Sequence, residues 1–78
     1  MKYKNGEQVK LRDKVLIDGK YHGDVVADMD GAEYSEEESE EKWGYLGSGV
    51  IINADFGGLV HYKQESLESD EIELLTRG

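Results

Sequence analysis

Apolar and polar residues alternate in short runs along most of the chain, and this period-two pattern predicts β-strands. None of the runs repeats its apolar residues every three or four positions, as a long helix would. An uninterrupted β-branched run at residues 50–52 is typical of a strand that is covered on both faces. The fold class is therefore predicted to be mostly β, with strands in the segments 9–11, 15–17, 24–30, 50–52, 59–62 and 71–74.

Glycine, aspartate and asparagine mark the turns, because the chain has ten glycines and no proline. Asp18-Gly19 and the nearby Gly23 are residues that tolerate a positive φ in a tight reversal. The segment 53–58 has the composition of a hairpin loop, with Gly57 or Gly58 in the left-handed position. These turns join the predicted strands into consecutive antiparallel pairs.

Five or six short strands in 78 residues are too few for a large sandwich, but they suffice for a small, partly open barrel of SH3-like size. A glycine-rich bend at 46–49 and one helical turn within 64–69 complete the predicted single domain, residues 1–78. The side chains expected to face its interior are Val9, Leu11, Val15, Ile17, Val25, Ala27, Met29, Trp43, Leu46, Val50, Ile52, Val60, Tyr62, Ile72 and Leu74. Tyr45 is also expected in the core.

Acidic residues outnumber basic ones by 18 to 9, which gives a net charge of −9. This sign argues against nucleic acid and against an anionic membrane surface as partners, because both are bound by neutralising phosphates. It favours a basic protein partner, although the charge could also serve solubility alone. There is no cysteine, no apolar run of membrane-spanning length and no apolar stretch in residues 1–14, so we expect a cytoplasmic protein without a signal peptide.

Much of the negative charge is concentrated in residues 28–43, which read DMDGAEYSEEESEEKW. Such a run repels itself, so residues 30–42 are expected to form a mobile acidic loop tethered at both ends. Its carboxylates would steer a basic partner, and nearby aromatic rings would anchor it. The carboxylates are Asp28, Asp30, Glu33, Glu36, Glu37, Glu38, Glu40 and Glu41, and the candidate anchors are Tyr34, Trp43 and Phe56.

Residues 11–31, LRDKVLIDGKYHGDVVADMDG, resemble the strand–turn–strand of KOW and other SH3-like barrels. The residues that carry the likeness are Asp13, Val15, Gly19, Gly23, Val25 and Val26. The likeness implies a small barrel more than a function. KOW domains bind RNA or ribosomal and transcriptional proteins through a basic loop, and the acidic charge of this chain means that RNA binding does not carry over.

Two further likenesses concern partner binding. The stretch EEESEEKWGY is similar to the acidic loop and tryptophan of peptide-binding SH3 domains, but the adjacent aromatic pair and the proline signature of those domains are missing. The pattern W-x-Y-L-x-x-G-V followed by G-L-V-H-Y resembles small bacterial proteins encoded near toxin genes. These likenesses suggest an immunity- or antitoxin-like inhibitor of a basic protein, acting as a monomer or weak homodimer.

A calcium-binding loop is the alternative explanation for the acidic run. With Gly31 as the sixth residue of an EF-hand loop, Asp28, Asp30 and Glu37 fall on ligand positions, but the first position is Val26 and no helices flank the loop. A third possibility is an accessory domain whose charge serves solubility. Neither histidine and none of the serines belongs to a nucleophile or metal motif, so we expect no enzyme, no cofactor and no specific metal site.

Overall fold

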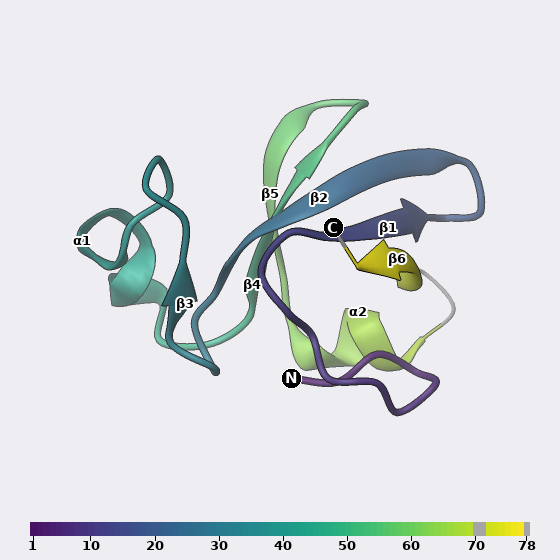
Figure 1. The fold of residues 1–78 in the computed structure, drawn as a ribbon, viewed down its shortest axis with the longest axis horizontal. Coiled ribbons are helices and arrows are strands. Elements are labelled where there is room, and N and C mark those ends of the chain that lie inside the picture. The colour runs from purple at the N-terminus through teal and green to yellow at the C-terminus, as the bar shows by residue number, and fades with distance from the viewer. Residues whose placement is uncertain (70–71, 78) are drawn as a thin grey trace.

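The computed structural model describes residues 1–69 and 72–77, which form a curled antiparallel sheet with short helical segments (Figure 1). The strands are β1 (Asp13–Ile17), β2 (Tyr21–Asp28), β3 (Glu33–Tyr34), β4 (Val50–Ala54), β5 (Gly58–Tyr62) and β6 (Ile72–Arg77). The helices are α1 (Glu40–Trp43) and α2 (Gln64–Glu68), and a 3-10 turn, η1, spans Gly44–Leu46. Neither of these helices is long and apolar enough to cross a membrane. The predicted mostly β class is confirmed.

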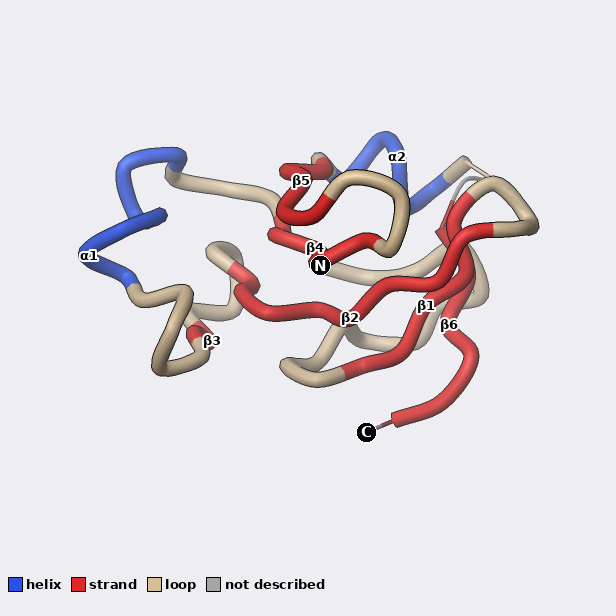
Figure 2. Tube along the Cα trace, turned by 90° about the horizontal axis from the view of Figure 1, so that it is seen from above, coloured by secondary structure: helices blue, strands red, loops and turns tan. Residues whose placement is uncertain are grey.

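The strands pair in the order β5-β4-β2-β1-β6, and β3 adds to the far end of β2. The long strand β2 is the centre of the sheet, since it pairs with β1, β3 and β4. The sheet curls on itself, as Figure 2 shows from above, yet β5 and β6 do not pair with each other. The predicted partly open barrel is therefore confirmed.

The hairpin turns use the residues that the sequence marks for them. Asp18 and Gly19 have φ values of 55° and 73° between β1 and β2, and Gly58 has a φ of 83° where β5 begins. Gly23 differs from its prediction, because it lies inside β2 rather than in a turn. A Cβ at Gly23 would lie 2.6 Å from Cγ2 of Ile52, so the missing side chain lets β2 approach the core closely.

The main core fills the inside of the curled sheet and is closed at one end by α2. The helical turn predicted within 64–69 is present, and its Leu67 is completely buried. Tyr3 and Ala54 are core residues that the alternation did not indicate. The buried residues of this core are Tyr3, Val9, Val15, Ile17, Val25, Val50, Ile52, Ala54, Leu67 and Ile72.

Residues 9–11 were expected to form a strand, but the chain turns there before β1 begins. Arg12 has a φ of 75°, and its N–H donates to the Val25 carbonyl at 2.8 Å. The buried carboxylate of Asp13 holds this turn, because its Oδ2 accepts from the Lys10 N–H at 2.9 Å and from the Tyr3 hydroxyl at 2.7 Å. This hydrogen bond explains why Tyr3 is in the core, since a buried hydroxyl needs a partner.

A second, smaller core lies on the other face of β2 and β4. The register shifts between Val25 and Ala27, so that Val25 pairs with Ile52 but Ala27 pairs with Ile51. This bulge moves Ala27 from the face of Val25 to the opposite face, where it is buried with Met29 and Ile51. Strand β4 is therefore covered on both faces, as its β-branched run predicts.

Candidate partner-binding surface

The acidic run does not leave the barrel as an irregular loop. Residues 30–46, which we call the acidic lobe, contain β3, α1 and η1 and lie at one side of the barrel (Figure 1). Strand β3 pairs with β2 through Ala27–Tyr34 and Asp28–Glu33. The side chain of Glu33 accepts a hydrogen bond from the Leu11 N–H at 3.2 Å. The lobe is thus joined to β2 and to the turn before β1, and the mobility of residues 30–42 stays a prediction.

Apolar side chains of the lobe pack against the second core. Tyr34, Trp43 and Leu46 are half-buried there, against Ala27, Met29 and Ile51. Trp43 and Leu46 are three residues apart and face the same side of the helical segment, so Tyr45 between them points away. Tyr45 is 79% exposed, and its predicted place in the core is wrong. The spacing of Trp43 and Leu46 was the sequence signal that could have shown this.

One of the eight carboxylates, Glu38, is committed to the structure of the lobe. Its Oε1 accepts from the Trp43 indole N–H at 2.8 Å and lies 2.9 Å from Nζ of Lys42. The indole hydrogen bond and the Lys42 ammonium lower the pKa of Glu38. Because both partners are inside the lobe, Glu38 fixes the indole and is already neutralised. Trp43 is correspondingly a less available anchor than predicted.

A second carboxylate, Asp28, is buried at the base of the lobe with only 1% of its surface exposed. Its Oδ1 accepts from the Gly31 N–H at 3.2 Å, while Oδ2 has no hydrogen-bond partner within the described residues. Gly31 covers Oδ2 so closely that a Cβ there would be 2.7 Å away. Burial raises the pKa of Asp28, and the charges of Asp30 and Glu33 raise it further. Asp28 is therefore out of reach of a partner.

Five of the remaining acidic side chains of the lobe are exposed. Within residues 1–69 and 72–77 none of them takes part in an ion pair. The lobe also exposes the ring of Tyr45, which lies in η1 just after α1. The exposed members of the predicted set are Asp30, Glu36, Glu37, Glu40 and Glu41.

Phe56 is not brought together with the acidic lobe. Strand β4 leaves the lobe side at Val50, which pairs with Asp28, and runs to the β4–β5 turn that contains Phe56. Phe56 is 50% exposed, and its ring centroid lies 4.9 Å from that of Tyr21. The two rings form a separate aromatic contact between hairpin tips, at the other end of the sheet.

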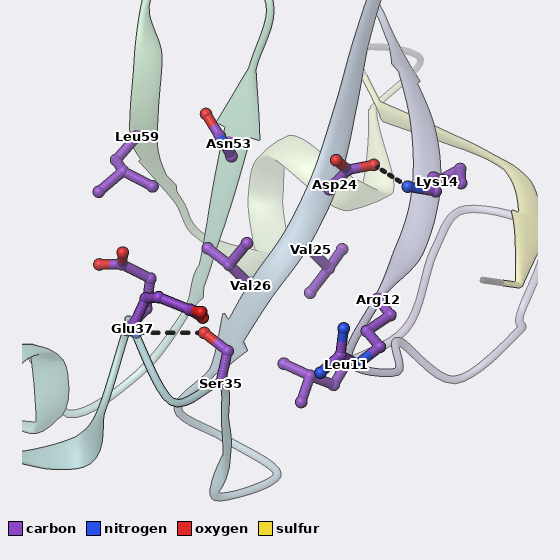
Figure 3. A pocket seen from close by; sticks show the side chains of 11 residues that line it. Leu11, Arg12, Lys14, Asp24, Val25, Val26, Ser35, Glu37, Asn53 and Leu59 are labelled. Carbon is purple, nitrogen blue, oxygen red and sulfur yellow. Dashed lines mark hydrogen bonds and ion pairs between the residues drawn. The ribbon is translucent and has the colours of Figure 1, made fainter.

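A groove of about 340 Å³ runs between the acidic lobe and the outer face of the sheet (Figure 3). Its size falls at the lower end of the range of small ligand sites, about 300 to 1,000 Å³. Lys14 and Asp24 form an ion pair of 2.7 Å at its rim. The lining comes from four strands, the turn before β1 and the lobe, and consists of Leu11, Arg12, Lys14, Asp24, Val25, Val26, Ser35, Glu37, Glu38, Asn53 and Leu59.

Metal binding gains no support from the geometry. In the part of the chain that the structure describes, no group of three or more His, Asp or Glu side chains is arranged to hold an ion. His61 lies in β5, where its Nε2 donates to the Ser48 carbonyl at 2.8 Å. This bond ties the bend that follows the lobe to β5, which is a structural role.

Comparisons of the chain with protein family models, with curated proteins and with solved structures gave no match. The resemblance to SH3-like and KOW barrels therefore stays a prediction. The features that bear on function are the charges of the lobe, its exposed ring and the groove beside it.

Proposed function

We propose that this chain is a non-enzymatic acidic binding module that docks onto a basic protein through the acidic lobe. In its sharpest form it is an immunity- or antitoxin-like inhibitor that covers the basic surface of its target. The observation that carries this proposal is that the lobe exposes five carboxylates, none of them in an ion pair within the described chain, together with the ring of Tyr45.

The packing of the lobe favours this role. Trp43 and Leu46 hold the lobe against the second core, and the Glu38–Trp43 hydrogen bond fixes the indole. A surface that is ordered before binding loses less conformational entropy when a partner docks. Exposed carboxylates on a lobe that is held in this way attract a basic partner over a long range and pair with arginine in a bidentate geometry.

Tyr45 is the best candidate for the anchoring ring. Its ring is highly exposed, and the neighbouring helix α1 carries exposed carboxylates. Tyrosine is enriched among the residues that dominate binding energies, because it offers a large rigid surface and a hydroxyl. Trp43 and Tyr34 are half-buried against the second core, and Phe56 would be available only to a partner that also reaches the hairpin tips.

We further propose that the protein acts in the cytoplasm as a monomer or weak homodimer, without a cofactor. The net charge of −9 opposes self-association. The sheet nevertheless has two edges, β5 and β6, through which copies could pair weakly.

Charge reversal on the lobe is expected to slow association with the basic partner about tenfold at low salt. The partner is first captured from lysate by salt-sensitive binding, then purified, and its association rate is measured by stopped flow across a salt series. The test variant carries Glu36→Lys, Glu40→Lys and Glu41→Lys. The control changes the net charge equally but lies outside the lobe, and it carries Glu65→Lys, Glu68→Lys and Glu73→Lys.

The two variants separate a lobe-specific site from general attraction. A loss confined to the lobe variant, with a weaker dependence on salt, supports docking through the lobe. Equal losses in both variants would show that only the total charge matters. An unchanged rate in the lobe variant would refute the proposal.

A further inference from the structure

Among the described residues, the groove beside the acidic lobe has one unpaired charge of each sign, and we infer that it binds an extended partner segment with a basic residue at one end and an acidic residue at the other. The basic side chain would pair with Glu37 and the acidic one with Arg12. This inference rests on the proposed function, because Glu37 belongs to the acidic lobe, and it adds the chemistry of the segment that the partner inserts.

Most charges around the groove are already neutralised. Lys14 and Asp24 pair at 2.7 Å, and Glu38 is paired with Lys42 at 2.9 Å. Arg12 and Glu37 are the exceptions, since neither forms an ion pair within the described residues. A groove with two opposite unpaired charges complements a ligand that carries the same two charges in reverse order.

The two free charges stand on different walls. Figure 3 shows Glu37 on the lobe, on the side of Leu59, and Arg12 on the turn before β1. The floor between them includes Val26, and Leu59 at the rim is 40% exposed. An apolar residue in the middle of the bound segment would cover this floor and remove apolar surface from water.

The width of the sheet under the groove sets the length of a segment that crosses it from the Leu59 side to β1, which Arg12 precedes. Leu59, Asn53, Asp24 and Lys14 are partners in register across β5, β4, β2 and β1. Three gaps between neighbouring strands span about 14 Å. An extended chain of five residues places its first, third and fifth side chains on one face over about 13 Å. The expected segment is therefore basic, apolar and acidic at alternate positions.

The backbone conformation at Arg12 allows its side chain to be removed without destabilising the turn. Its φ of 75° lies in the left-handed region, which an arginine adopts at a cost and glycine adopts freely. The turn itself is held by main-chain bonds, from the Arg12 N–H to Val25 and from the Asp13 N–H to Lys10. Arg12→Gly should therefore remove the charge from the groove without loosening the fold.

The probe is the peptide acetyl-Arg-Gly-Val-Gly-Glu-amide, titrated into the protein while the methyl resonances of Val26 and Leu59 are followed by NMR. We expect saturable shifts of both methyl groups, with an affinity at least threefold higher than that of acetyl-Arg-Gly-Val-Gly-Arg-amide. Equal or tighter binding of the dibasic peptide would overturn the inference, because a merely acidic surface prefers the greater positive charge.

Two variants locate the site. Arg12→Gly and Glu37→Gln should each weaken the bipolar peptide at least fivefold, and Arg12→Gly should melt at or above the temperature of the unaltered chain. Unchanged peptide affinity in either variant would overturn the inference. Neither substitution occurs in the triple variant Glu36→Lys, Glu40→Lys and Glu41→Lys. Peptide binding in the groove can therefore be refuted while salt-sensitive docking of the whole partner through the lobe is still supported.

Discussion

Replacing Ile51 with alanine is expected to release the acidic lobe from the barrel, whereas replacing Ile52 with alanine should destabilise the barrel as a whole. The two isoleucines are neighbours on β4 with 1% and 0% of their surface exposed, but they point into different cores. Removing such a side chain costs about 2 to 5 kcal/mol through lost burial and the cavity that is left. The two variants therefore make the same chemical change, and they differ only in whether it falls in the main core or in the second core.

Trp43 makes the two outcomes distinguishable, because it is the only tryptophan and lies in the second core. Denaturant unfolding is followed by tryptophan fluorescence and by far-ultraviolet circular dichroism. In Ile52→Ala both signals should change together at a lower midpoint. In Ile51→Ala the fluorescence should change first, while the sheet persists. Coincident transitions in both variants would show that lobe and barrel unfold as one cooperative unit.

The barrel was largely predictable because its signals are local. Alternating apolar residues mark the strands, and Asp18-Gly19 and Gly58 mark two turns by their tolerance of positive φ. The β-branched run of β4 correctly indicated a strand covered on both faces. The bulge after Val25 left no comparable signal, because an extra residue in a strand is set by pairing with β4 and leaves the alternation intact.

The candidate surface was predictable in its charge but not in its composition. The sequence places eight carboxylates in one segment and cannot tell an exposed carboxylate from a buried one. Asp28 is buried because β2 continues to it and Gly31 folds over it, and Glu38 is used by Trp43. Both facts depend on contacts made after the lobe packs. The sequence did not predict Arg12 as a residue of the proposed groove site, because none of its neighbours indicates the left-handed backbone conformation at this position.

Replacing Asp28 with asparagine is expected to stabilise the protein at pH 7 by about 1 to 2 kcal/mol, because a buried charge without full hydrogen bonding is removed. The neutral amide keeps the acceptor for the Gly31 N–H. The substitution removes no hydrogen bond at the other oxygen, because Oδ2 has no hydrogen-bond partner within the described chain. Burial of the carboxylate thus works against the attachment of the lobe at neutral pH.

The pH dependence tests the same idea with a definite sign. Burial raises the pKa of Asp28 above its ordinary value of 3.8, so the folded protein retains this proton to a higher pH than the unfolded chain does. Stability from this group therefore falls as pH rises from 3.8 through the folded pKa, and it stays low above it. The advantage of Asp28→Asn should be absent below that window, grow across it and then remain constant.

Measuring the difference between the variant and the unaltered chain isolates Asp28 from the other carboxylates. Glu38, whose pKa is lowered, loses its stabilising effect as pH falls, and this opposite trend is common to both proteins and cancels. Glu36→Gln removes the same charge from an exposed side chain of the lobe that does not raise the pKa of Asp28, and it should change stability by less than about 0.5 kcal/mol at any pH. If Asp28→Asn were the less stable protein at pH 7, the charged Asp28 would be holding the lobe in place, and the buried carboxylate would have to be regarded as its attachment point.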